Sequence, residues 1–162
     1  MTLDKYQHLE QLSDIVRAEK SLGKIIVLAN GCFDVIHVGH IRYLKEAKNQ
    51  GDILIVALNS DTSMRRLKGP GRPILPEAER VAIVGALAFV DHVILFSEDT
   101  VERVLLALQP HVHAKGSDYS TDTVPEKDTV RGYGGRIAIT GGPKVKNTSD
   151  LIREIADKVG HE

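Results

Sequence analysis

The stretch VLANGCFDVIHVGHIRYL, from Val27 to Leu44, decides the fold of this chain. Its first residues form an apolar run without polar alternation, which is typical of strands that are covered on both faces of a parallel sheet. The run ends near Ala29, Asn30-Gly31 make a turn, and a helical pattern begins near His37. A strand that leads directly into a helix predicts the first unit of a parallel α/β sheet.

The same alternation of strands and helices continues along the chain. It predicts right-handed crossovers and a Rossmann-like, doubly wound, mainly parallel five-stranded sheet with helices on both faces. Such sheets bind ligands beyond the carboxyl ends of their strands, where the strand order reverses. We expect an N-terminal helical extension over residues 1–23 and one domain over residues 24–162. The expected strands are KIIVLA, DILIVAL, HVILF, HVHAK and RIAIT, and the expected helices cover about residues 3–20, 41–48, 76–89, 100–108, 126–133 and 148–159.

The composition is that of an ordinary globular protein, with 42% hydrophobic and 27% charged residues among 162. A formal net charge of -1 provides no bulk attraction for nucleic acid or for an anionic membrane. The chain has no Trp, four Tyr and three Phe, so it also lacks an obvious platform for stacking bases. We therefore expect no nucleic-acid partner, and a bound anion would need a local cluster of positive groups.

Cysteine usage and the N-terminal residues bear on the compartment. Cys32 is the only cysteine, which excludes an internal disulfide and fits a reducing cytosol. The N-terminal residues MTLDKYQHLEQL are polar, and no apolar run approaches the roughly 18 residues of a membrane span. We expect a soluble, cytoplasmic protein without a membrane partner.

His37 and His40 bracket Gly39 at the expected start of the first crossover helix. Backbone N–H groups and the positive end of the helix dipole attract phosphate there, and both imidazoles can donate to one anion. Gly39 permits close approach by a ligand or by backbone. Other uses remain open, because one histidine near a helix end is often only a cap and the pair could bind zinc with a distant third ligand. A dinucleotide site is disfavoured because the stretch lacks G-x-G-x-x-G.

The stretch NGCFDVIHVGH resembles the signature of the nucleotidyltransferase superfamily, whose hallmark is His-x-Gly-His. The segments GDILIVALNSD, RRLKGPGRPILPEAER, GALAFVDHVILFSEDT and KGSDY resemble, in order and spacing, the adenylyltransferases of ADP-heptose synthesis. That family occurs alone or as the C-terminal half of a bifunctional protein with a sugar kinase. The resemblance implies transfer of AMP from ATP to heptose 1-phosphate, with pyrophosphate as the second product.

The resemblance also implies the catalytic groups. His37 and His40 would hydrogen-bond the triphosphate and stabilise the pentavalent transition state, while Lys68 and Arg80 would add positive charge. We expect Arg65, Arg66, Lys68 and Arg72 to lie in one basic loop, with Arg65 and Arg66 as surface charges. Mg²⁺ is expected as a cofactor that binds mainly through the substrate phosphates, so no protein ligand is assigned to it.

The remaining implied residues bind the two substrates. Thr148 and Ser149 are also good helix caps, and both roles can coexist. The superfamily usually has Ile-Ser-Thr-Thr at this point, and Lys146 and Asn147 depart from it. For the sugar phosphate we expect Asp34, Asp61 and Arg72. For ATP we expect Gly31, Cys32, Phe33, Gly39, Lys115, Gly116, Asp118, Tyr119, Thr148 and Ser149.

Two other functions remain open at this point. A CTP-dependent cytidylyltransferase for glycerol 3-phosphate shares His-x-Gly-His, but that family usually carries Arg-Thr-Glu-Gly where this chain has GGPKVKN, and an arginine where it has Ala88. A non-catalytic nucleotide sensor would have no need of a second phosphate site. The family further implies a homodimer.

Overall fold

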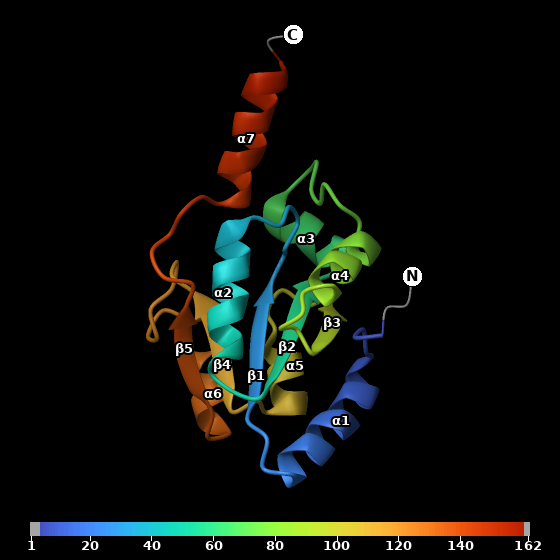
Figure 1. Ribbon diagram of the computed structural model, residues 1–162, viewed down its shortest axis with the longest axis vertical. Coiled ribbons are helices and arrows are strands. Elements are labelled where there is room, and N and C mark those ends of the chain that lie inside the picture. The colour runs from blue at the N-terminus through green and yellow to red at the C-terminus, as the bar shows by residue number, and fades with distance from the viewer. Residues whose placement is uncertain (1–3, 161–162) are drawn as a thin grey trace.

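The computed structural model describes residues 4–160 and contains a five-stranded, all-parallel sheet in the order β3-β2-β1-β4-β5 (Figure 1). The predicted fold class is confirmed. The strands are β1 (Ile26–Gly31), β2 (Ile53–Asn59), β3 (His92–Phe96), β4 (Val112–Gly116) and β5 (Arg136–Thr140). The helices are α1 (Leu9–Ser21), α2 (Val38–Lys48), α3 (Asp61–Lys68), α4 (Glu77–Gly85), α5 (Glu102–Leu108), α6 (Lys127–Gly132) and α7 (Thr148–Val159).

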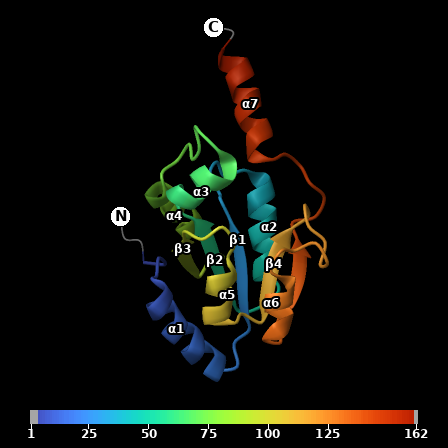
Figure 2. The same cartoon turned by 180° about the vertical axis from the view of Figure 1, so that it is seen from behind.

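The sheet separates two hydrophobic cores, because alternate side chains of its buried strands point to opposite faces. Val27 and Val56 face one core, where Leu44 of α2 and Val84 of α4 cover them. The opposite core holds the other alternate positions of β1 and β2 and is covered by α1, α5 and α6 (Figure 2). The strand order reverses between β1 and β4, so the ligand-binding crevice is expected beyond their carboxyl ends.

The N-terminal segment pairs with the edge of the sheet before α1 begins. The backbone N–H of Val93 donates to Lys5 O at 2.8 Å, and the N–H of Gln7 donates to Val93 O at 3.0 Å. This pairing holds the segment extended, which is why the helix starts at Leu9 and not near residue 3. Residues 1–3 of the expected extension and residues 161–162 of the expected domain lie outside the described residues.

The expectation of a basic loop over residues 65–72 is wrong for its first part. Arg65, Arg66 and Lys68 lie on α3, and the loop starts at Gly69, where φ is +87°. The helix forms because Ser60 caps it by accepting from the Ser63 N–H at 3.2 Å, and because Met64 is fully buried beneath it. Its basic last turn complements the negative end of the helix dipole.

Helix α7 extends away from the sheet in both views and contains no buried residue (Figures 1 and 2). Its first turn nevertheless lies beside the carboxyl ends of the strands, because residues 141–147 lead back from β5 across the end of α2. Within residues 4–160, none of the helices combines the length and the apolar character that crossing a membrane requires.

Candidate functional site

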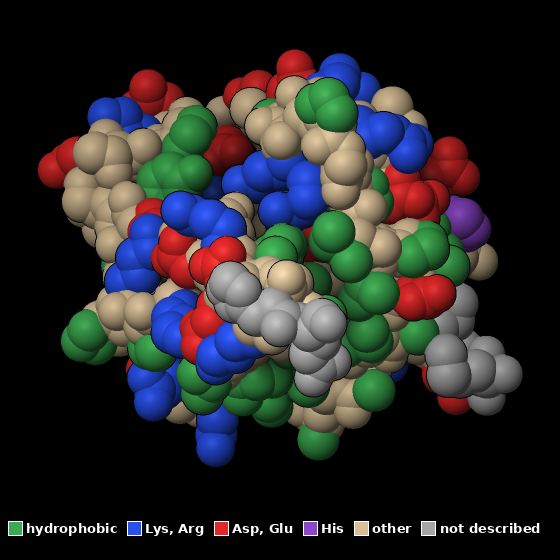
Figure 3. Space-filling view, turned by 90° about the horizontal axis from the view of Figure 1, so that it is seen from above, with side chains coloured by type: hydrophobic (Ala, Val, Ile, Leu, Met, Phe, Trp, Pro, Cys, Tyr) green, Lys and Arg blue, Asp and Glu red, His purple; other side chains and the backbone are tan. Residues whose placement is uncertain are grey.

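A cavity of about 670 Å³ lies at the carboxyl ends of the strands. Its walls come from the β1–α2 junction, α3 and the loop after it, the segment that follows β4, and residues 140–149. Lys and Arg side chains gather beside the hollow on this face of the molecule (Figure 3). The volume suits a ligand of the size of a nucleotide.

The two histidines cap α2 reciprocally. Nδ1 of His37 accepts a hydrogen bond from the Gly39 N–H at 3.1 Å, and Nδ1 of His40 accepts one from the His37 N–H at 3.3 Å. Because a neutral imidazole that accepts at Nδ1 carries its proton on Nε2, each ring keeps an Nε2–H donor. Nε2 of His37 is shielded from bulk water and has no hydrogen-bond partner among residues 4–160. An unsatisfied donor at the wall of a cavity is a binding point for an anion.

Gly39 is required by the position of the His37 ring. A Cβ at residue 39 would lie 2.9 Å from Cε1 and 3.0 Å from Nδ1 of His37, closer than atoms in such contact normally come. A side chain here would push the ring away from its cap position. The glycine between the two histidines therefore serves the imidazole geometry.

The environment keeps the histidines neutral. Burial lowers the pKa of His40 to about 4, with a smaller effect from His37, and burial also lowers the pKa of His37. The ring centroids are 4.0 Å apart, so two imidazolium charges would repel each other strongly. Phe33 packs on the far side of His40, with a centroid distance of 5.1 Å. At neutral pH both rings are therefore uncharged hydrogen-bond donors.

Asp34 holds the loop that follows α3. Its buried carboxylate accepts from the backbone N–H groups of Ile74 and Leu75 at 2.9 Å and from Nε of Arg72 at 2.7 Å. Burial is the largest single influence and raises the pKa of Asp34. The hydrogen bonds together outweigh it, so the pKa is lowered overall. Both side chains line the cavity, so Asp34 positions Arg72 at its wall. Since its oxygens already accept three donors, this is a positioning role for Asp34.

Arg80 and Asp61 do not line the cavity, although both were expected at the site. Arg80 is fully buried and donates to Cys32 O at 2.7 Å, to Asn59 O at 2.8 Å and to the Asp61 carboxylate at 2.8 Å. It thereby ties the ends of β1 and β2 to α4. The guanidinium was expected to add positive charge among the catalytic groups, but it is buried beneath the site and holds the backbone there in place.

The basic residues of α3 separate into two groups. Lys68 lines the cavity, whereas Arg65 does not. Arg66 points to the segment after β3, where Nε donates to Asp99 at 3.0 Å. Lys68 and Arg72 are thus the positive groups on the β2 side of the cavity.

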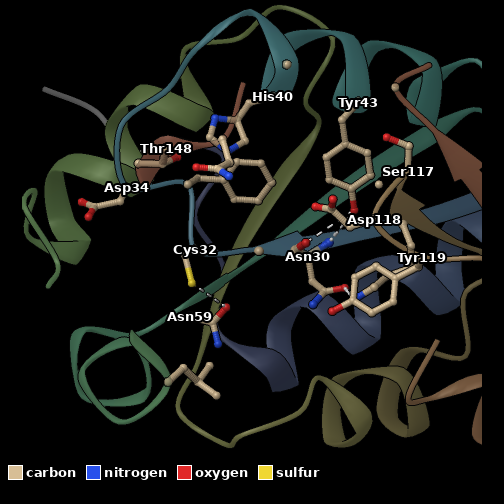
Figure 4. Close-up of a pocket in the computed structure, with 18 of the residues that line it drawn as sticks. Asn30, Cys32, Asp34, His40, Tyr43, Asn59, Ser117, Asp118, Tyr119 and Thr148 are labelled. Atoms are coloured by element: carbon tan, nitrogen blue, oxygen red, sulfur yellow. Dashed lines mark hydrogen bonds between the residues drawn. The ribbon is translucent and has the colours of Figure 1, made fainter. Parts of the chain in front are cut away.

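Lys115 is a positive group on the β4 side of the cavity. Its neighbours Asn30 and Tyr119 are shown in Figure 4. Lys115 is 7% exposed, and its Nζ donates to Asn30 Oδ1 at 3.4 Å and lies 4.6 Å from the centroid of the Tyr119 ring. The hydroxyl of Tyr43 donates to Ala114 O at 2.7 Å, which joins α2 to β4 next to this lysine. Burial lowers the pKa of Lys115.

The first turn of α7 closes the cavity wall. Asn147 is the N-cap, because its Oδ1 accepts from the Asp150 N–H at 2.8 Å. Thr148 and Ser149 line the cavity and are free of that capping role. The cap is thus Asn147, one of the two residues that depart from the superfamily pattern.

Most of the residues expected from the sequence converge on this cavity. Those that line it are Gly31, Cys32, Phe33, Asp34, His37, Gly39, His40, Lys68, Arg72, Lys115, Gly116, Asp118, Tyr119, Thr148 and Ser149. Several other polar residues line the cavity although no binding role was predicted for them, and these are Asn30, Tyr43, Asn59, Glu126, Lys144 and Lys146. Asn30 was assigned only to a turn, and the position of Glu126 depends on a loop whose path no periodicity reveals.

Among residues 4–160, no group of three or more His, Cys, Asp or Glu is arranged to hold a metal ion. A divalent ion that enters with a nucleotide is held mainly by phosphate oxygens and water, so it needs no such group from the protein.

Comparisons with known proteins agree with this geometry. A family model described as cytidylyltransferase-like matches residues 28–149. The chain is 46% identical over 158 residues to the bifunctional protein HldE of Geobacter metallireducens and 48% identical over 151 residues to that of Geotalea uraniireducens, covering 98% and 93% of this chain. It spans about a third of the length of these relatives, 32% and 31% respectively.

Two solved structures are similar in fold. A lipopolysaccharide core biosynthesis protein from Thermoplasma volcanium is 35% identical, with a TM-score of 0.61 over 72% of this chain and 94% of that protein. Pantoate-beta-alanine ligase from Francisella tularensis is 15% identical, with a TM-score of 0.67 over 97% of this chain and 78% of that protein, which shows a shared fold alone. The family model covers three quarters of the sequence, including both histidines, and the chain therefore belongs to the cytidylyltransferase-like family of nucleotidyltransferases.

Proposed function

We propose that this chain transfers AMP from ATP to a sugar 1-phosphate, with heptose 1-phosphate as the first candidate, and releases pyrophosphate. The observation that carries the proposal is the pair of neutral imidazoles at the start of α2: each accepts a backbone N–H at Nδ1 and so carries an Nε2–H group, and that of His37 has no partner among residues 4–160. The sugar rests on the resemblance to the adenylyltransferases of ADP-heptose synthesis and on the similarity to HldE proteins.

The proposed reaction is one in-line displacement. A phosphate oxygen of the sugar phosphate forms a bond to the α-phosphorus of ATP as the bond to the β-phosphate oxygen breaks, and pyrophosphate leaves. The protein then acts by positioning two anions and by stabilising the negative charge that builds on the transferring group. Neutral Nε2–H donors suit this task, because they are fixed by the cap and do not need to take up a proton first.

In this proposal each side of the cavity binds one of the two substrates. Lys115 and Tyr119 on the β4 side would hold the nucleoside of ATP, with the triphosphate extending to His37 and His40. Lys68 and Arg72 on the β2 side would hold the phosphate of the acceptor. Mg²⁺ would arrive bound to the phosphates of ATP, and the homodimer and the cytoplasmic location remain predictions from the sequence.

The donor and the acceptor can be tested together by measuring pyrophosphate release. ATP and CTP are each combined with heptose 1-phosphate, hexose 1-phosphates and glycerol 3-phosphate. We expect release with ATP and a sugar 1-phosphate. Release only with CTP and glycerol 3-phosphate would support the cytidylyltransferase alternative, and nucleotide binding without any release would support a non-catalytic sensor.

Replacing His37 or His40 with asparagine separates donation by Nε2 from helix capping. The Oδ1 of asparagine can accept at a position near that of Nδ1, whereas the Nε2–H donor is lost. Asparagine is also a favoured residue at the N-cap, which is the position of His37. Each variant should lower kcat by about 10²–10³ with little change in the melting temperature. Unchanged kcat in both variants, measured by pyrophosphate release, would exclude a catalytic role for the imidazoles.

Lys68 and Arg65 provide a matched pair on one helix, since only Lys68 lines the cavity. Lys68→Ala should raise the KM for the sugar phosphate by about 10- to 100-fold, as expected for loss of a hydrogen bond between charged groups. Arg65→Ala should leave this KM unchanged. Steady-state kinetics with saturating ATP measure both values, and equal effects of the two substitutions would contradict the assignment of the β2 side.

A further inference from the structure

The structure contains a buried carboxylate at the cavity wall that none of the roles above uses. We propose that Glu126 is a specificity-determining residue that accepts a hydrogen bond from the exocyclic amine of the nucleotide base, next to Lys115 as the donor to a ring nitrogen. This inference rests on the proposed function for its choice of nucleotide.

Glu126 is 6% exposed, and it lines the cavity. Its Oε2 is buried and has no hydrogen-bond partner among residues 4–160. A buried carboxylate without a donor is costly, so its retention calls for an explanation.

Two structural roles are open to this side chain, helix capping and an ion pair, and it fills neither of them among residues 4–160. Glu126 stands at the N-cap position of α6, but its side chain makes no capping hydrogen bond. Lys115, a buried cation that lines the same cavity, donates its hydrogen bond to Asn30 instead. Glu126 partly offsets the fall in the pKa of Lys115 that burial causes. The carboxylate and the ammonium group thus line one cavity without joining in an ion pair.

A ligand group that contacts both Glu126 and Lys115 must offer a hydrogen-bond donor to the carboxylate and an acceptor to the ammonium group. Adenine offers this pair on one edge, with its 6-amino group beside N1. The Lys115 ammonium lies over the Tyr119 ring, and both residues line the same cavity as Glu126. Tyr119 is 38% exposed and lines the cavity, so its ring offers an aromatic surface for a planar base.

The same arrangement disfavours bases with a carbonyl at this position. Hypoxanthine has an oxygen in place of the 6-amino group and a protonated N1, so it would place an acceptor opposite the Glu126 carboxylate and a donor opposite Lys115. A site built to bind an N–H group discriminates strongly against an analogue that lacks it, because its own polar groups are left unpaired.

The test is the equilibrium binding of ATP, ITP and 2′-deoxy-ATP to the full chain without acceptor, measured by isothermal titration calorimetry. The wild-type chain should bind ATP at least about 30-fold more tightly than ITP. The glutamine side chain of Glu126→Gln can donate to the hypoxanthine oxygen. This variant should therefore lower the preference for ATP over ITP, expressed as the ratio of the two dissociation constants, by about 10-fold or more. Asp128→Asn, an exposed position on the same helix that does not line the cavity, should leave the ratio unchanged.

Several results would overturn the inference. A wild-type ratio near one would do so even if Glu126→Gln failed to fold. An unchanged ratio in a folded Glu126→Gln variant would assign Glu126 a structural role, and a change confined to 2′-deoxy-ATP would assign it to the ribose. Because no acceptor is present, failure of AMP transfer would contradict the proposed function while leaving this inference standing.

Discussion

The site depends on two hydrogen bonds that run from backbone N–H groups to imidazole nitrogens at the start of α2. They fix His37 and His40 over the first turn, and they occupy Nδ1 of each ring, so that the Nε2–H groups remain for a ligand. Gly39 makes the arrangement possible, since a Cβ there would collide with the His37 ring. A helix N-terminus already favours an anion, and the capping imidazoles add two directed donors to it.

Buried charges hold the surrounding walls in place. Asp34 gathers the loop after α3 through two backbone N–H groups and Arg72, and Arg80 binds the ends of β1 and β2 from below. Removing one partner of such a buried set leaves the other charge uncompensated, which is strongly destabilising. The acceptor side of the cavity therefore owes its shape partly to Asp34 and Arg80, two charged groups that have no need to touch a substrate.

The sheet and most helices could be predicted because strands buried on both faces leave clear apolar runs in the sequence. The histidines could be placed at the ligand-binding edge of the sheet because they follow the first of these strands, at the β1–α2 junction. Helix α3 was missed because only one of its buried residues, Met64, is apolar, and such a short segment shows no apolar period. Arg80 was expected among the catalytic groups because a sequence shows that a residue is charged but not that it is buried. Glu126 was not found, since it reaches the cavity wall only through the fold of the segment between β4 and α6.

The central claim is that His37 and His40 are neutral Nε2–H donors, and nitrogen-detected NMR of their side chains in the nucleotide-free chain tests it directly. The account predicts that at pH 7 both rings are uncharged, with Nδ1 unprotonated and Nε2 protonated. Because burial lowers the pKa of His40 to about 4, its ring should stay neutral as the pH falls from 8 to 5 and gain a proton only below that. A proton on Nδ1 of either ring, or an imidazolium signal at pH 7, would contradict the account.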